Sequence, residues 1–224
     1  MCKLKSAIIL KDRIFIPNYD SHTQMLEELG IKDTRANAEK LFIRAELYPA
    51  NGDVFSPVDT WTFKVDQDIT PEWYVENYDK ERMYKAVKEW AKDRIHIGVD
   101  GLKINAGANH FIKDCKNVEV CDSASISKVC GSASISKVYD SASISEVYDS
   151  ASISEVCGSV SISKVYDSAS ISEVCGSAII AASPYGWRNK EKLIISDNAT
   201  FKDNSTKTIW QSGDWKINIV GENK

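Results

Sequence analysis

Hydrophobic and polar positions repeat every nine residues between positions 122 and 175. The unit reads (Asp/Gly)-Ser-Ala-Ser-Ile-Ser-(Lys/Glu)-Val-(Tyr/Cys), and six copies follow one another without a gap, with Val160 replacing the alanine once. Serines alternate with Ala and Ile at a period of two, which is typical of a β-strand with one buried face. The Asp or Gly position is expected to form a corner. The repeat therefore predicts a parallel β-solenoid with buried ladders of Ala, Ile and Val.

A disordered, serine-rich linker is the alternative for a segment of such biased composition. The strict phase of the apolar positions favours the solenoid. The same frame continues more weakly on both sides, at Val120 and Cys121 upstream and at 197–201 downstream. The downstream copy is three residues out of step, and the loop at 183–188 is expected to hold the three additional residues.

The charged position of the unit favours 18 residues per coil over a 27-residue triangle. With 18 residues the stacked columns are Lys128-Glu146-Lys164 and Lys137-Glu155-Glu173, so three of the four neighbouring pairs have opposite charges. With 27 residues only one of three pairs does. Each stacked pair of opposite charges stabilises a sheet by a few tenths of a kcal/mol, as an order-of-magnitude value. The shorter coil also places Cys157 directly on Cys175.

Residues 1–110 do not repeat, and their pattern predicts an α+β domain. Strands are expected at 5–10 and 13–16 as a hairpin, and at 42–48 and 60–65. Ser21 and Gln24 form the capping signature of a helix at 22–29. Another helical turn starts near Pro71, and Asp79 is expected to cap a longer helix at 80–93 with an apolar inner face.

The predicted organisation is an N-terminal domain at 1–110, a solenoid at 111–205 and a C-terminal β cap at 206–224. The cap would contain strands at 206–210 and 215–220, with Trp210 and Trp215 covering the last coil. A bare solenoid end is an open sheet edge that pairs with other chains. The N-terminal domain and the tail are therefore expected to cap the solenoid.

Composition and charge exclude several classes of protein. The formal net charge is -4, shared equally between residues 1–110 and the remainder, so there is no basic surface for direct binding of nucleic acid. The apolar run at 7–10 is too short for a signal sequence or a membrane span. A cytoplasmic protein with reduced cysteines is the expectation.

No catalytic, cofactor-binding or metal-binding motif is evident. Hexapeptide acyltransferases require a period of six and a histidine in the coil, and calcium-binding nonapeptide rolls require glycine- and aspartate-rich turns. His110, Cys115 and Cys121 match no zinc-finger spacing and lack a fourth ligand. Cys and Tyr exchange freely at the last position of the unit, which indicates a packing position rather than a nucleophile. The outward serines could bind ice, crystals or glycans, although a soluble, inert face is the favoured interpretation.

One cluster of residues is the candidate surface for a partner or ligand. It consists of Trp61, Asp66, Asp68, Glu72 and Trp73. Carboxylates beside aromatic rings can carry out acid–base chemistry. The alternative is a turn followed by the start of a helix, where an acidic residue favours the positive end of the helix dipole.

The segments AELYPANGDVFSPVDTWTFKVDQDITPEWY (45–74) and AVKEWAKDRIHIGVDGL (86–102), followed by SASISKVY units, carry a family resemblance. They resemble nonapeptide-repeat β-solenoid proteins of gut Firmicutes and their phages. The resemblance covers nearly the whole chain and implies no established activity, cofactor or site residue. Its phage association implies an anti-defence role, such as an anti-CRISPR inhibitor, in the cytoplasm of a bacterial or phage-infected host cell.

The sequence therefore predicts a non-enzymatic binding or scaffold protein without a cofactor. Its expected partner is a protein or a protein–nucleic acid complex, not a membrane, and a homodimer stays open. Two alternatives stay open. One is a phage-encoded inhibitor that occludes a bacterial defence nuclease, and the other is an enzyme whose site lies within residues 1–110.

Overall fold

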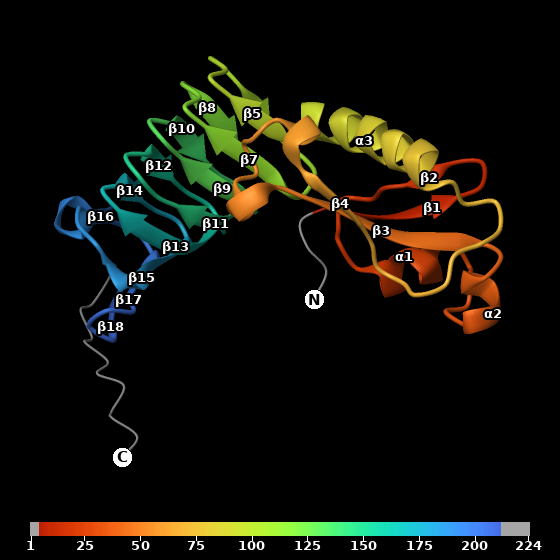
Figure 1. Cartoon of the computed structure of the whole chain (residues 1–224). Helices are drawn as coiled ribbons and strands as arrows, with labels where there is room; N and C mark the ends of the chain where they lie inside the picture. The colour runs from red at the N-terminus through yellow and green to blue at the C-terminus, as the bar shows by residue number, and fades with distance from the viewer. Residues whose placement is uncertain (1–4, 212–224) are drawn as a thin grey trace. The chain divides into compact units, whose positions relative to one another are not determined.

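The chain divides between Ile95 and His96 into two compact units. The computed structural model describes residues 5–211 (Figure 1). Each unit has its own sheets and its own hydrophobic core.

The first unit is built on a four-stranded antiparallel sheet of order β2-β1-β3-β4. Its strands are β1 (Ser6–Leu10), β2 (Ile14–Phe15), β3 (Phe42–Tyr48) and β4 (Thr62–Val65). All five residues of β1 are buried. A strand buried throughout its length needs cover on both faces of the sheet, and helices supply this cover.

Helix α3 (Glu76–Lys92) lies over one face of this sheet, and α1 (His22–Glu28) and α2 (Arg35–Ala38) lie over the other (Figure 1). Ile8, Leu10 and Phe42 pack with Met25 and Leu26 of α1. Because side chains alternate along a strand, the even-numbered residues of β1 and β3 face α1. Short 3₁₀ turns, η1 (Ala50–Gly52) and η2 (Val58–Thr60), connect β3 to β4.

Helix α3 begins earlier than the sequence predicts. Its N-cap is Val75, and Asp79 lies one turn inside the helix, where it is almost fully buried. The Asp79 carboxylate accepts a hydrogen bond from the backbone N–H of Val75 at 3.0 Å and from Arg82 at 2.7 Å. Asp79 therefore stabilises the start of α3 by accepting a backbone N–H that has no partner within the helix. The prediction that Asp79 is the N-cap is wrong.

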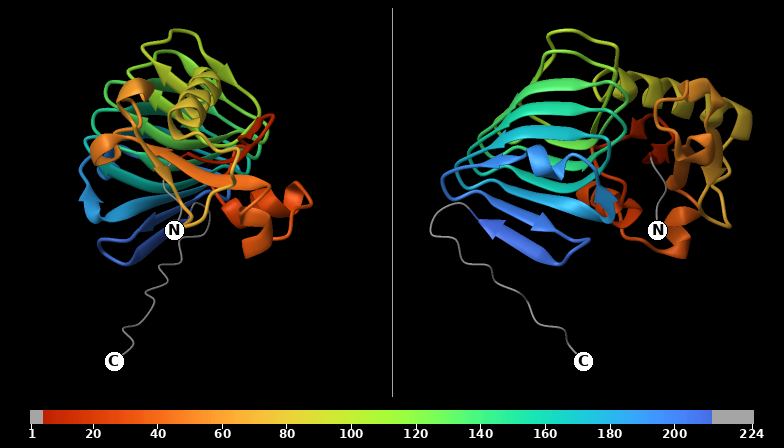
Figure 2. Two further views of the ribbon diagram at one scale, coloured as in Figure 1. Left: turned by 45° about the vertical axis from the view of Figure 1, so that its right-hand side comes forward. Right: turned by 90° about the vertical axis from the view of Figure 1, so that its left-hand side faces the viewer.

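The second unit is a β-solenoid of two sheets whose strands stack in parallel (Figure 2). The chain alternates between the sheets, one of order β16-β14-β12-β10-β8-β6 and the other of order β18-β17-β15-β13-β11-β9-β7-β5. The strands are β5 (Ile95–Ile97), β6 (Lys103–Ile104), β7 (His110–Lys113), β8 (Val118–Val120), β9 (Ser125–Cys130), β10 (Ser134–Val138), β11 (Ser143–Val147), β12 (Ser152–Val156), β13 (Ser161–Asp167), β14 (Ser170–Val174), β15 (Ile179–Trp187), β16 (Ile194–Ile195), β17 (Thr200–Asp203) and β18 (Thr208–Gln211).

The register confirms the predicted coil of 18 residues. Ser143 pairs with Ser125 below and Ser161 above, and Ser134 pairs with Ser152. The charged columns are therefore those predicted: Lys137 lies 3.1 Å from Glu155, and Lys164 lies 3.5 Å from Glu146.

Ala, Ile and Val of the repeats fill the space between the two sheets. Their side chains are at most 1% exposed, as at the isoleucines Ile126, Ile135, Ile144, Ile153, Ile162 and Ile171. Stacking identical residues about 4.8 Å apart produces a dry, continuous core from a low-complexity sequence.

The corners require backbone with positive φ, which explains the Asp or Gly position of the unit. Positive φ occurs at Asp122, Gly131, Asp140, Asp149, Gly158, Asp167 and Gly176. Aspartate tolerates this conformation. Its carboxylate also accepts a hydrogen bond from a backbone N–H of the neighbouring coil, as Asp149 does from Gly131 at 3.0 Å. At Gly176 a Cβ would lie 2.8 Å from the backbone nitrogen of Gly158, so the position admits only glycine without a shift.

The solenoid is longer at its start than the sequence predicts. Strands β5, β6 and β7 belong to its two sheets, so the coil begins near residue 95 and the predicted start at 111 is wrong. The repeat pattern was too weak to find these strands because loops with unrelated residues separate them. At the other end, β15 begins in the 18-residue register, with Ile179 on Ser161, and its register on β13 shifts between Ala182 and Trp187. Strand β16 then pairs with β14 three residues further on, with Ile194 on Glu173, which confirms the insertion near 183–188. The 3₁₀ turn η3 (Lys190–Lys192) follows it.

Strand β18 pairs antiparallel with β17 and corresponds to the strand predicted at 206–210. The strand predicted at 215–220 lies outside the described residues.

Cys157 and Cys175 stack in adjacent coils and form a disulfide, with their Cα atoms 4.6 Å apart. The expectation that all six cysteines are reduced is wrong for this pair. The 18-residue register brings the two sulfur atoms together, whereas Cys115, Cys121 and Cys130 are buried and free.

Candidate functional site

The structure divides the predicted partner-binding cluster. Trp61 is only 2% exposed, and its indole N–H donates to the carbonyl of Ser56 at 3.0 Å. Trp61 is thus a core residue, and its assignment to a binding surface is wrong. The sequence pattern around it concealed this, because a turn-rich loop precedes β4.

The other four residues of that cluster lie on the segment that follows β4. Asp66, Asp68 and Glu72 are exposed, and Trp73 is half-buried. The Trp73 indole donates to the carbonyl of Lys40 at 2.8 Å, which fixes the ring beside the start of β3. Whether these four residues bind a partner stays a prediction.

Three large apolar side chains that lie near Trp73 or its hydrogen-bond partner along the chain are exposed. Leu41 is 45%, Val75 57% and Tyr78 62% exposed. Trp73 bonds to the residue before Leu41, and Val75 and Tyr78 occupy the cap and first turn of α3. We call Leu41, Trp73, Val75 and Tyr78 the Tyr78 patch. An exposed group of large apolar and aromatic side chains is typical of a protein-binding surface.

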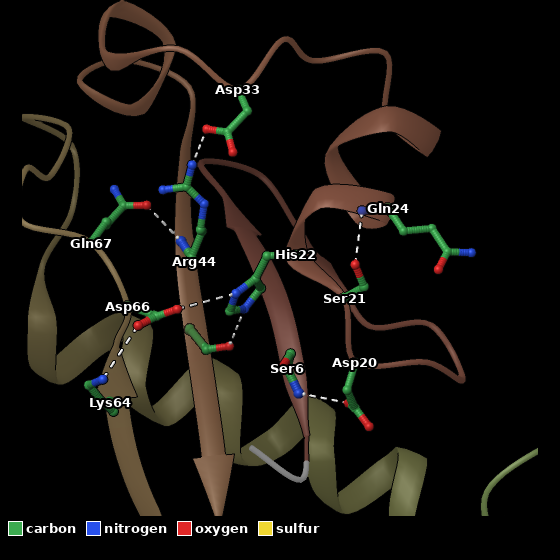
Figure 3. Close-up of polar contacts among 11 residues, drawn as sticks. Ser6, Asp20, Ser21, His22, Gln24, Asp33, Arg44, Lys64, Asp66 and Gln67 are labelled. Carbon is green, nitrogen blue, oxygen red and sulfur yellow. Dashed lines mark hydrogen bonds and ion pairs between the residues drawn. The ribbon is translucent and has the colours of Figure 1, made fainter. Parts of the chain in front are cut away.

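A polar cluster on the α1 side of the sheet was missed in the sequence. It consists of His22, Glu46 and Asp66, whose ligand atoms all lie within 4.8 Å of one another. His22 is the first residue of α1 and Asp66 follows β4 (Figure 3). Glu46 lies in β3. No spacing signal links three residues from three separate elements, so only the fold brings them together.

Hydrogen bonds fix the backbone around His22 and Asp66. Ser21 caps α1 by accepting the N–H of Gln24 at 3.3 Å, which fixes the start of the helix at His22. Asp66 donates its N–H to the carbonyl of Arg44 at 2.8 Å, and Arg44 N–H donates to Gln67 at 2.9 Å (Figure 3). These bonds keep the segment after β4 against β3.

The His22 ring itself lies between a carbonyl and a carboxylate. Its Nε2 is 3.2 Å from the carbonyl oxygen of Ala45, and its Nδ1 is 3.6 Å from Asp66 Oδ2. His22 and Glu46 are buried, whereas Asp66 is partly exposed and 3.4 Å from the Lys64 ammonium group. This arrangement can hold a proton or a metal ion between nitrogen and oxygen donors.

Among residues 5–211, one further cluster of side chains that could ligate a metal occurs, and it consists of Glu155, Cys157 and Cys175. His110, Cys115 and Cys121 do not form such a group in this part of the chain. Cys115 and His110 instead bond to nearby backbone carbonyls, of Lys113 and Ala106.

The Cys and Tyr residues at the last position of the repeat stack from coil to coil, and their environment is that of packing residues. Burial is the main cause that raises the pKa of the Cys130 thiol, and burial likewise raises the pKa of the Tyr148 hydroxyl above its usual range. Both groups are therefore protonated at neutral pH, which does not suit a nucleophile.

A pocket of about 680 Å³ lies near the C-terminal end of the solenoid. Its lining residues are Lys190, Glu191, Leu193, Ile195, Phe201, Asp203, Thr206, Thr208 and Trp210. Lys190 Nζ lies 2.6 Å from the buried Asp203 carboxylate. Burial of Asp203 opposes its ionisation, yet hydrogen bonds from Lys190, Ser205 and Thr206 hold its pKa well below the usual range.

Comparison with protein-family models, with curated proteins and with solved structures finds no match for this chain. Among residues 5–211, no helix combines the length and the apolar character that a membrane crossing requires. The structure thus defines a β-solenoid with a scaffold-like fold, and the function must be argued from its surfaces.

Proposed function

We propose that this protein is a non-enzymatic binding protein that engages a protein or a protein–nucleic acid complex through the Tyr78 patch. The observation that carries the proposal is the exposure of Leu41, Val75 and Tyr78 beside the hydrogen-bonded ring of Trp73. Two exposed acidic residues, Asp68 and Glu72, precede Trp73 in the sequence. An aromatic and apolar centre with a charged border is the usual anatomy of a protein interface.

The solenoid supports this function as a rigid scaffold. Its core is dry and its strands are in register, so its surface presents straight ladders of hydroxyl and charged groups. Such an array changes little in shape on binding. The protonated state of the Cys130 and Tyr148 side chains favours a structural role for that column.

The test is capture of the partner with a photoreactive side chain at the exposed position Asn77, compared between the otherwise wild-type chain and a double variant, Val75→Ser with Tyr78→Ser. Serine is a favourable N-cap, so the variant should keep α3 intact. We expect the double variant to lose about 10-fold or more in affinity, because aromatic residues dominate interface energy. If the captured partner is a nuclease, the result would favour a protein that inhibits a bacterial defence nuclease by occlusion.

A matched control removes exposed apolar side chains elsewhere. Tyr185 is 93% and Ile194 62% exposed, and both belong to the second unit. Tyr185→Ser with Ile194→Ser should leave capture unchanged. If the control abolishes binding while the Tyr78 patch variant does not, the proposed surface is wrong.

A further inference from the structure

The backbone of the solenoid holds Cys157 and Cys175 side by side. Each follows a buried valine at the same position of the repeat, and Val156 pairs with Val174 in the adjacent coil. The N–H of Cys175 also donates to the carbonyl of Val156 at 2.8 Å, and the two cysteine Cα atoms lie 4.6 Å apart. Because strand pairing supports this spacing independently of the disulfide, the two sulfur atoms should remain neighbours after the disulfide is reduced.

Glu155 lies beside the same two sulfur atoms. Side chains two positions apart along a strand point to the same side, so the repeat places Glu155 and Cys157 on one side of the coil. A carboxylate oxygen of Glu155 and the two sulfur atoms all lie within 4.8 Å of one another. Lys137 Nζ lies 3.1 Å from Glu155 Oε2. A carboxylate has about four lone-pair sites, so Glu155 can keep this contact and also ligate a metal ion.

We infer that Cys157, Cys175 and Glu155 bind a divalent metal ion that prefers sulfur ligands, such as Zn²⁺, when the disulfide is reduced. Two sulfur ligands favour Zn²⁺ over Mg²⁺, Ca²⁺ and Mn²⁺, which prefer oxygen. With Zn–S distances of about 2.3 Å, a tetrahedral site separates two sulfur atoms by about 3.8 Å, a spacing that neighbouring parallel strands can supply. The site belongs to the second unit and does not depend on the Tyr78 patch.

Reduction and metal binding both require access to the sulfur atoms. Cys157 and Cys175 are half-exposed, whereas Cys115, Cys121 and Cys130 are buried. Two molecules of a small thiol such as glutathione would reduce the disulfide: each protein sulfur gains an electron and a proton, and the small thiols leave as their own disulfide. Zn²⁺ then replaces the thiol protons, which are released to solvent, and is itself neither oxidised nor reduced.

The metal ion would replace the covalent link between two coils. The disulfide joins adjacent coils in the oxidised protein, and a metal ion bound by Cys157 and Cys175 would join the same coils in the reduced protein. A ligand that binds only the folded chain stabilises it by mass action. Since the unfolded chain has no preformed site, Zn²⁺ should raise the melting temperature of the reduced protein and leave that of the oxidised protein unchanged.

Titration of the full chain with Zn²⁺, in its reduced and its oxidised form, tests the site. A phosphine reductant opens the disulfide, and EDTA followed by gel filtration removes any bound metal. The reduced protein should bind Zn²⁺ with protection of Cys157 and Cys175 from alkylation, and Co²⁺ should give a thiolate charge-transfer band. The oxidised protein should bind about 100-fold more weakly or not at all, because it offers no thiolate ligand.

Two pairs of variants identify the ligands. Cys157→Ser with Cys175→Ser changes half-exposed positions, so it should fold, and it should lose the Zn²⁺ site. Glu155→Gln should weaken Zn²⁺ binding to the reduced protein about 10-fold. Glu146→Gln makes the same change at the same repeat position in the other sheet and should bind as the wild type does.

Four results would each overturn the site. They are the absence of saturable Zn²⁺ binding by the reduced protein, equal affinity in the oxidised protein, unchanged affinity in the double serine variant, and equal affinity in the two glutamine variants. Circular dichroism of each variant before metal is added shows whether it is folded, and the alkylation pattern of the wild type tests the site without any substitution.

Discussion

Side chains one position apart on a solenoid strand have opposite surroundings. Ile144 is 1% exposed between its stacked neighbours Ile126 and Ile162, whereas Ser145 points to solvent. Core positions offer neither water nor a polar partner, so a charged side chain there lowers the free energy of unfolding strongly. Outer positions tolerate most small polar residues.

Ile144→Asp should therefore lower the free energy of unfolding by at least about 3 kcal/mol. Ser145→Asp, which introduces the same carboxylate on the next residue, should change it by less than about 0.5 kcal/mol. Thermal and urea melting followed by circular dichroism measure both effects. Equal losses in the two variants would mean that the strand faces the other way.

Asp203 illustrates a buried charge whose partners stabilise it. Lys190 lies 2.6 Å from its carboxylate, and the Ser205 hydroxyl donates to it at 2.6 Å. The pKa of Asp203 is lowered in the folded state. Ionised Asp203 therefore stabilises the fold above its unfolded-state pKa of about 3.9, and this contribution is lost as the pH falls toward the folded value.

Asp203→Asn should cost about 1–3 kcal/mol at pH 7 because Lys190 loses its anionic partner. The difference from the wild type should stay constant above about pH 5 and shrink as the pH falls below about 4. Urea unfolding between pH 3 and pH 7 measures it. Asp197→Asn is the control, since an amide oxygen can still accept the N–H of Gly176. A difference that grows in acid would contradict the argument.

At the scale of elements, the repeats could be predicted because six copies place each residue type in one environment. The strand, the buried ladder, the corner and the 18-residue register all follow from that repetition. The first unit has no such redundancy. Helix α2 depends on a local cap, in which Thr34 accepts the N–H of Asn37, inside a segment without a strong apolar pattern.

The candidate sites were harder to predict than the fold. Asp66 appeared in the sequence beside Trp61, yet the structure places it with His22 and Glu46. Those contacts are between residues 20 or more positions apart, and they depend on how α1 lies on the sheet. Periodicity predicts which face of an element is buried, but it does not predict which polar side chains meet across elements.

The charge ladder of one sheet contains a pair of like charges that can be corrected. Glu155 and Glu173 stack directly on each other, above Lys137. Glu173→Lys should raise the free energy of unfolding by about 0.2–1 kcal/mol at low salt. Lys137→Glu should lower it, because Glu119, residue 137, Glu155 and Glu173 would then form one acidic column.

Thermal melting at low and high salt measures the effect of the ladder. The Debye screening length falls to about 3 Å at 1 M salt. The changes in unfolding free energy of both variants should therefore be smaller at high salt. A change of the opposite sign, or one that persists at high salt, would show that packing rather than charge determines the effect at this position.

At the scale of the whole molecule, the ends of the solenoid decide whether it stays a single folded chain. Stacked coils gain stability from neighbours on both sides, and the last coil lacks one of them. Without β18, strand β17 would be the edge of its sheet, but β18 pairs with it antiparallel over four residue pairs. Asn204 also donates to the carbonyl of Ala182 at 2.7 Å, which fixes the turn that leads into β18.

Truncation after Ser205 should make the protein self-associate, because it removes β18 and leaves the hydrogen-bonding edge of β17 free. It also removes Thr208 and Trp210 from the pocket in which the nearly buried Phe201 lies. Light scattering coupled to size-exclusion chromatography should show dimers or larger species whose proportion rises with concentration. Truncation after Gln211 is the matched control, since it retains β18 and should elute like the full chain. A monomeric Ser205 truncation would show that β18 does not protect this edge, and association of both truncations would assign the protection to residues beyond 211.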